Sequence, residues 1–315
     1  MPRSTKLIRM RSLVVLALAY ALASTSQASG LGPQASGLGP QASGSSTAQL
    51  QAAPESTALP EVSAFAAQVR ARIRTDRALQ AQYTFLERRE EITMSKLGKV
   101  KDGPVKVYEV YPSEDPGNLY KRLVSVDGKP LSTAEFAKND AVHQKDIFAR
   151  LNESPAQKTK RARAEAKERA EEQREIDEIF AVYAITLVRR EVVNGHPTIL
   201  AGLEPRRSYK PRTDEGKVMK KIRARAWIHE TEHQIVRVEI EALDDIGFGL
   251  GVVGKIYKGT VGEFVRTKVN GEVWLPARAR FTAKGRALFR KFAIDSVTEW
   301  WDYKKFSVST TEETR

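Results

Sequence analysis

The order of apolar and polar residues predicts a helix at the start of the folded region. In residues 61–79, Val62, Phe65, Val69 and Ile73 recur at helical spacing, with arginines among the residues between them. Such spacing gives a helix one apolar face and one charged face. We therefore expect an amphipathic helix that packs its apolar face on the rest of the protein.

Most of the remaining chain alternates apolar and polar residues with a period of two. In residues 234–243, for example, Val236, Val238 and Ile240 alternate with charged residues. This alternation is typical of a strand with one buried face and one wet face. By alternation and β-favouring composition we expect further strands at residues 82–93, 105–111, 119–126, 181–193, 196–203, 222–228, 260–269, 273–283, 288–303 and 305–309.

Short turns separate many of these segments. Asn194-Gly195 and Asn270-Gly271 are strong hairpin signals, and Asp127-Gly128 is a turn by its residue types. Short connections favour antiparallel neighbours. About nine to eleven strands of this kind tend to curl, and a helix laid into the concave face would cover the core. The predicted fold class is α+β, mostly antiparallel β, as a curled sheet or unclosed β-barrel with an N-terminal helix.

One charged segment interrupts the strands. Residues 157–178 consist almost entirely of charged residues and alanine, which are good helix formers. Opposite charges stand four residues apart, as in Arg161 and Glu165. We therefore expect a charged helical insertion within residues 132–180. Because it holds few large apolar residues, we expect it to be solvated, and it is a candidate docking arm for an envelope protein.

The first residues have the layout of a secretory signal peptide. Four basic residues and no acidic residue stand in residues 1–11, followed by an apolar run at residues 13–22 and then by small residues. The run is about half of the roughly 20 residues that span a bilayer. We predict a signal peptide at residues 1–28, cut after Ala23 or Ala28. The protein would then be exported, periplasmic or in the cell envelope, and soluble after cleavage.

A low-complexity repeat follows the predicted signal peptide. The sequence QASGLGP occurs twice in succession and then begins again. Glycine, serine and proline of this kind cannot bury enough apolar surface to become ordered. We therefore divide the chain into a disordered linker at residues 29–60, a β domain at residues 61–309 and a tail at residues 310–315.

The net charge and the cysteine content limit which partners and which chemistry are expected. The formal net charge is +13, and a basic surface attracts anionic lipids, acidic polymers or nucleic acid. Export makes nucleic acid an unexpected partner. The chain has no cysteine, which excludes disulfides, a thiolate nucleophile and a lipid-modified N-terminal cysteine.

Residues 229–233 read His-Glu-Thr-Glu-His, which matches the H-E-x-x-H motif of zinc peptidases. In those enzymes the motif lies on a helix, where both imidazoles bind Zn²⁺ and the glutamate is the general base. Here both flanking segments alternate as strands do, which places the motif at the turn between them. No third ligand is evident, because the other two histidines lie far away in the sequence. A zinc hydrolase that uses His229, Glu230 and His233 is therefore the alternative function, not the favoured one.

Residues 246–257 form an apolar stretch that is interrupted by four glycines. Glycine leaves room where another group approaches a strand closely. Two interpretations are open: a core strand with a bulge, or the rim of an apolar cavity. In the second interpretation, the candidate ligand-binding residues are Phe248, Leu250, Val252, Ile256 and Tyr257.

Two short segments resemble a known family. Residues 226–229 (AWIH) followed by residues 235–238 (IVRV) are similar to the periplasmic lipoprotein carrier family and its outer-membrane lipoprotein-sorting relatives, although His229 stands where those proteins often carry Asp. Residues 273–276 (VWLP) resemble a strand entry in exported members of the same group. The resemblance covers residues 61–309 apart from the insertion, which departs from the compact carrier pattern.

The resemblance implies an unclosed β-barrel that is capped by helices and holds acyl chains in an apolar interior, without catalytic residues. Together with the pattern of the chain, it favours a non-catalytic cell-envelope protein that binds a lipid or a lipidated protein. No cofactor is expected, and no glycine-rich phosphate loop is present in the sequence.

Overall fold

A computed structural model describes most of the chain from the predicted helix onward, namely residues 58–73, 82–95, 99–111, 120–248 and 254–306. The predicted signal peptide, almost all of the predicted linker and the predicted tail lie outside the described residues. Among the helices that the structure describes, none combines the length and apolar character needed to cross a bilayer.

The described strands form one antiparallel sheet in the order β4-β3-β2-β1-β13-β12-β11-β8-β7-β6-β5, and β10 pairs with both β12 and β9. Their bounds are β1 Tyr83–Met94, β2 Val100–Tyr111, β3 Tyr120–Val126, β4 Lys129–Pro130, β5 Tyr183–Val193, β6 His196–Pro205, β7 Ile222–His229, β8 Ile235–Ala242, β9 Ile246–Phe248, β10 Gly254–Ile256, β11 Val261–Val269, β12 Val273–Ala287 and β13 Arg290–Lys305. The path ends at β4 and β5, so this sheet is open. The predicted fold class is confirmed, with 13 strands instead of nine to eleven because the structure adds short ones.

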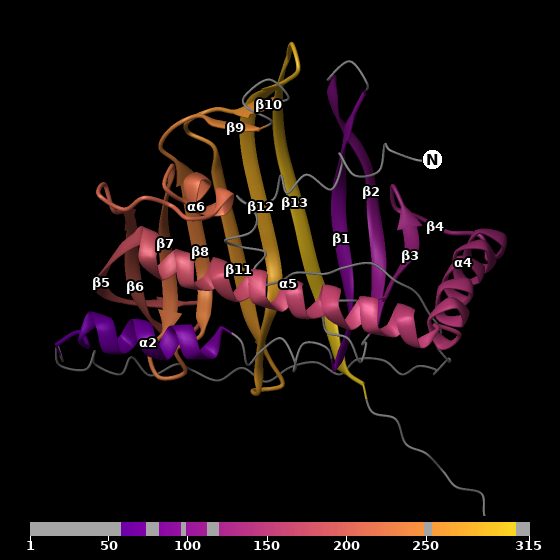
Figure 1. Cartoon of the computed structure of the whole chain (residues 1–315), viewed down its shortest axis with the longest axis horizontal. Helices are drawn as coiled ribbons and strands as arrows, with labels where there is room; N and C mark the ends of the chain where they lie inside the picture. Colours follow the sequence, from indigo (N-terminus) through magenta and orange to yellow (C-terminus); the bar gives the residue numbers. More distant parts are fainter. Residues whose placement is uncertain (1–57, 74–81, 96–98, 112–119, 249–253, 307–315) are drawn as a thin grey trace, which may run out of the picture.

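Four described helices accompany the sheet: α2 Val62–Arg72, α4 Thr133–Leu151, α5 Pro155–Val182 and α6 Asp214–Met219. Figure 1 shows α5 running across one face of the sheet, with α2 beside it and α4 at the far end near β3 and β4. Ser132 and Ser154 start α4 and α5 with capping boxes, in which the serine and a residue three positions later satisfy each other's backbone N–H groups.

The expected charged insertion forms α4 and α5, but it is not solvated throughout. The ion pair between Arg161 and Glu165 is present at 2.9 Å on the exposed part of α5. Near the end of the helix, however, Ile176 is buried and Val182 is completely buried against the sheet. The prediction of a helix that cannot pack deeply is therefore wrong for its last turns, where apolar residues return at helical spacing.

Cross-strand partners show which side chains share the face that α2 and α5 cover. Ala201 pairs with Ala226, Ala226 with Val238, Val238 with Phe264, and Phe264 with Ala279. Directly paired residues point to the same side of a sheet. This row, on what we call the helix face, is buried and apolar across β6, β7, β8, β11 and β12.

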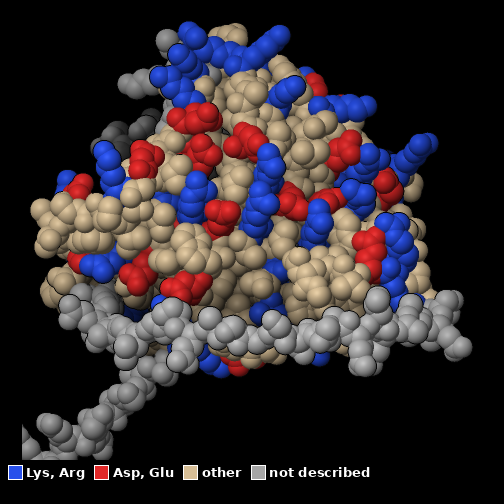
Figure 2. Space-filling view, turned by 180° about the vertical axis from the view of Figure 1, so that it is seen from behind, with Lys and Arg blue, Asp and Glu red and all other residues tan. Residues whose placement is uncertain are grey.

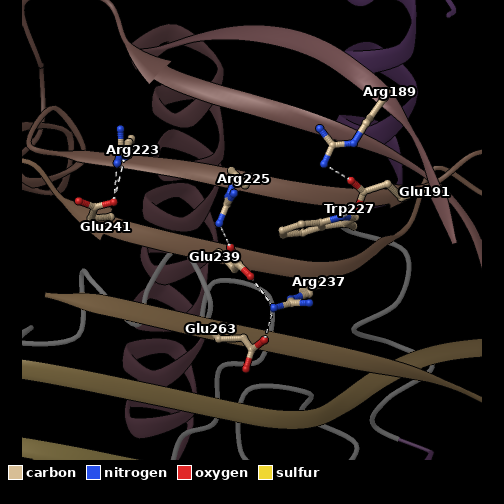
Figure 3. A network of polar contacts seen from close by, with 9 residues as sticks. All are labelled: Arg189, Glu191, Arg223, Arg225, Trp227, Arg237, Glu239, Glu241 and Glu263. Atoms are coloured by element: carbon tan, nitrogen blue, oxygen red, sulfur yellow. Dashed lines mark hydrogen bonds and ion pairs between the residues drawn. The ribbon is translucent and has the colours of Figure 1, made fainter. Parts of the chain in front are cut away.

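The opposite face, here called the solvent face, is lined with ion pairs. Arg223 meets Glu241 at 2.6 Å across β7 and β8, and Arg225 meets Glu239 at 2.5 Å. Figure 3 shows these pairs and the neighbouring network around Trp227, and Figure 2 shows acidic and basic side chains interspersed over this side. Opposite charges directly across a sheet stabilise each other. This pairing is enough to explain why charged residues alternate with apolar ones in β7 and β8, and no functional role is needed for them.

Candidate functional site

An apolar cavity lies between the helix face of the sheet and the two helices that cross it. Its free volume is about 80 Å³. Every one of its lining residues is apolar: Phe65, Ala66, Val69, Ile73, Ile176, Ile179, Phe180, Ile185, Leu187, Ala201, Leu203, Ala224, Ala226, Ile228, Ile235 and Val238. An apolar cavity of this kind offers no hydrogen-bond partner to water, so it suits an apolar occupant.

Small side chains on two neighbouring strands form the floor of the cavity. Ala201 on β6 pairs with Ala226 on β7, and Ala224 lies two residues before Ala226 on the same face. Alanine at these inward positions leaves space that isoleucine or leucine would fill. The cavity is thus set by the choice of small residues at the centre of a face that is otherwise built from large apolar side chains.

Helix α2 forms the roof over this floor. Glu61 caps the helix by accepting hydrogen bonds from the backbone N–H groups of Ser63 and Ala64 at 2.8 and 2.7 Å. The buried side chains of α2 are Phe65 and Val69, both of which line the cavity. Ala66 and the C-cap residue Ile73 also line the cavity but are not fully buried, so α2 is held by few deeply buried side chains.

Arg70 joins the two helices at the edge of the cavity. Its guanidinium meets the carboxylate of Asp177 at 2.5 Å, and it lies 5.7 Å from the ring centroid of Phe180. Both charged side chains are about half exposed. An exposed pair of this kind contributes about 0–1 kcal/mol, so it orients α2 without locking it in place.

His233, in the β7–β8 turn, packs against Phe65, one of the residues that line the cavity. Its ring lies 5.2 Å from that of Phe65 and its backbone has a φ of 57°. Burial lowers the pKa of His233 below its ordinary value of 6.5, and the charge of Arg72 lowers it further. The neutral imidazole is therefore favoured, in keeping with an apolar surrounding.

The His-Glu-Thr-Glu-His segment lies at a turn, as its strand-like flanks predict. His229 is the last residue of β7, and its backbone N–H donates to the carbonyl of Gln234 at 2.8 Å. Glu230, the expected general base of a zinc peptidase, instead forms an ion pair with Arg190 at 2.7 Å. Among the described residues, no group of three His, Asp or Glu side chains is placed to hold a metal ion. The arrangement gives the zinc-hydrolase alternative no support.

The structure brings together side chains that are distant in the sequence around the same turn. The rings of His196 and His229 lie 5.9 Å apart, and the ring of Trp274 lies 4.7 Å from His196. Glu232 accepts hydrogen bonds from Trp274 at 2.7 Å and Lys268 at 2.5 Å. Burial lowers the pKa of His229, which favours its neutral form in this packed polar cluster beside the hydrogen-bonded carboxylate of Glu232.

Two of the candidate ligand-binding residues of the glycine-rich stretch, Ile256 and Tyr257, have side chains that the structure describes. Ile256 is buried in the main core and Tyr257 is half-buried, and neither lines the cavity. Phe248 ends β9, while Leu250 and Val252 lie outside the described residues. A ligand site on this stretch stays a prediction, and the residues that line the cavity under α2 are not among the ligand-binding candidates that the sequence indicates.

A buried charged pair occupies the helix face farther along the sheet. Glu87 on β1 is 1% exposed and accepts from Lys121 on β3 at 2.5 Å and from the indole N–H of Trp300 at 3.0 Å. Burial lowers the pKa of Lys121, while the Glu87 carboxylate acts in the opposite direction. The sequence does not reveal this pair, because neither its partner strand nor its face can be read from spacing alone.

Comparison with known proteins finds solved structures that are similar to this one. No family model matches the chain, and no curated protein matches it. Similar solved structures include a domain described as an outer membrane lipoprotein-sorting protein from Vibrio parahaemolyticus, at a TM-score of 0.30 and 11% identity over 79% of this chain and 93% of that one. A DUF1329 family protein from Desulfovibrio piger has a TM-score of 0.29 and 13% identity over 80% and 95% of the two chains.

A LolA superfamily protein from Nitrosomonas europaea is also similar, at a TM-score of 0.28 and 10% identity over 80% of this chain and 96% of that one. The likeness is one of fold. The chemistry of the site rests on the side chains described above.

Proposed function

We propose that this protein binds an apolar chain, such as the acyl chain of a lipid or of a lipidated protein, in the cavity between α2, α5 and the sheet. The observation that carries the proposal is the lining, in which all sixteen residues are apolar. Burial of each methylene group contributes about 0.8 kcal/mol, so a long chain gains enough to bind without polar contacts. A binding role of this kind needs no catalytic residue.

The size of the cavity defines how binding would proceed. Sites for drug-sized ligands are roughly 300–1,000 Å³, whereas the free volume here is about 80 Å³. A whole acyl chain therefore requires the roof to move. Helix α2 is the element suited to this, because it buries only Phe65 and Val69 and its ion pair to α5 is half exposed. We infer that the ligand displaces α2 from the sheet.

Export and the finer choice of partner belong to the same proposal. The signal-peptide pattern of residues 1–28 supports a periplasmic or cell-envelope location, where both lipids and lipidated proteins are present. Docking of an envelope protein on the exposed part of α5 stays a prediction from the sequence.

Titration of the purified protein with a fluorescent acyl probe tests the proposal, together with lipid extraction and mass spectrometry of the same preparation. We expect saturable binding of about one probe per protein, with competition by unlabelled fatty acid, because the proposed site is one apolar cavity. A protein that carries no lipid after purification and gives no saturable probe signal would show that the cavity is only a packing defect.

A further inference from the structure

The turn between β12 and β13 has unusual residues for its geometry. It is a two-residue turn, Leu288-Phe289, between the paired residues Ala287 and Arg290. Leu288 has a φ of 51°, in the left-handed region that favours glycine or asparagine. Phe289 is 94% exposed, more than any other large apolar side chain of the described residues.

Two other two-residue turns in the same chain place aspartate, asparagine or glycine where φ is positive. Asp127-Gly128 and Asn194-Gly195 have positive φ at both positions, as a type I′ hairpin turn requires. Compared with these two turns, Leu288-Phe289 makes a less stable turn and leaves an aromatic ring exposed to water. Stability of the fold does not explain these two residues, because a strained residue at an exposed tip destabilises the folded state.

Basic residues surround the exposed ring. Between Ala283 and Ile294 the sequence contains Lys284, Arg286, Arg290 and Lys291 and no acidic residue. The hairpin tip projects from one end of the molecule in Figure 1, and Figure 2 shows Lys and Arg side chains covering that end.

The charges at the tip are paired by strand register with like charges. Arg286 lies directly across from Lys291 on β13 and across from Lys255 on β10. Like charges directly opposite each other destabilise a sheet. On the solvent face of β7 and β8, by contrast, Arg223 and Arg225 each face a glutamate. Lys255 also meets the carboxylate of Asp245 at 3.3 Å, whereas Arg290 and Lys291 have no acidic residue near them in the sequence. The tip therefore carries an excess of positive charge.

We propose that this hairpin tip docks on the surface of an anionic lipid bilayer, with Phe289 entering the interface and the surrounding bases contacting lipid phosphates. An exposed aromatic ring alone would suit any apolar partner, and a basic cluster alone would suit any polyanion. Their combination at one projecting tip matches an anionic membrane interface, which offers apolar depth beneath negative charge. The proposal is independent of the cavity, because the tip residues do not line it.

Co-sedimentation with lipid vesicles tests the docking. The purified protein is mixed with vesicles of phosphatidylcholine alone, or of equal parts phosphatidylcholine and phosphatidylglycerol. We expect binding to the anionic vesicles, with weaker binding at high salt. Each base near the surface strengthens binding about fivefold, so the double variant Arg290→Glu, Lys291→Glu should lose at least 25-fold in affinity. Phe289→Ser should lose binding, whereas Phe148→Ser, which removes an exposed phenylalanine from α4 (70% exposed), should keep it.

A further variant separates docking from folding. Replacement of the turn by residues that suit a positive φ at its first position alone, Leu288→Gly with Phe289→Asn, should raise the stability to urea while it abolishes vesicle binding. The proposal is overturned if the wild type fails to bind anionic vesicles, or if it binds neutral vesicles as well. It is also overturned if Phe289→Ser binds like the wild type, which would leave a site for polyanions only.

Discussion

Glu87→Gln should lower the free energy of unfolding by about 3–5 kcal/mol. The change keeps the shape of the side chain but removes the charge that faces Lys121, whose ammonium lies 2.5 Å from the Glu87 carboxylate. A buried ammonium without its counter-ion costs far more than a lost surface pair. Equilibrium urea denaturation of both proteins measures the difference.

The pH dependence of this loss is part of the expectation. The pKa of Lys121 is already lowered by burial, and the variant also lacks the carboxylate that opposes the shift. A lysine whose pKa is lower in the folded state than in the unfolded state gains stability as the pH rises between these two values. The destabilisation by Glu87→Gln should therefore shrink as the pH is raised towards 10.

Glu299→Gln is the matched control. Glu299 lies on β13 next to Trp300 and pairs with Arg88 at 3.3 Å, and both charged side chains are about 40% exposed. The same chemical change here should alter the free energy of unfolding by about 0–1 kcal/mol. Equal effects of the two variants would mean that Glu87 is not held in a buried charged pair.

Ala226→Leu should lower the affinity for an acyl probe at least tenfold. The larger side chain would fill the floor of a cavity whose free volume is about 80 Å³, and would press against α2 from below. Overpacking of a core position costs about 1–3 kcal/mol, so the variant should stay folded. Probe titration measures the affinity, and thermal unfolding of the same sample measures the stability.

The control for this variant is Ala279→Leu. Ala279 is buried on the same face of the sheet but packs in a separate cluster with Phe264 and Trp300, away from the cavity. Both variants make the same substitution at a buried position of the same face, so the loss of affinity should distinguish them. If Ala279→Leu lowered the affinity for the probe as much as Ala226→Leu does, the effect would reflect general loosening of the core.

The sheet could largely be predicted from the sequence, because its signals are local. The alternation in β8 and the turn residues Asn194-Gly195 and Asn270-Gly271 each specify a strand or a hairpin without reference to distant residues. The sequence predicts a strand at Leu288-Phe289, where the structure has a turn, because the two residues are apolar and are not glycine, asparagine or proline. Its geometry is imposed by the pairing of β12 with β13.

The candidate site could not be predicted in the same way, because it depends on contacts between distant parts of the chain. Phe65, Ile176 and Ala226 meet only when α2 and α5 cross the helix face of the sheet. Each of the three reads locally as an ordinary core residue. The small residues at inward positions of β6 and β7 are the one local signal, and they reveal a cavity only when the covering helices are known.

Photolabelling with an acyl chain tests the central claim most directly. A fatty acid with a photoreactive group near its end would be bound, cross-linked by light and located by peptide mass spectrometry. We expect the label on α2, on residues 176–187 and on residues 224–238, which together line most of the cavity. Labels on the solvent face, for example at Val261 or Thr282, or labels spread evenly over the chain, would contradict the claim that this cavity is the binding site.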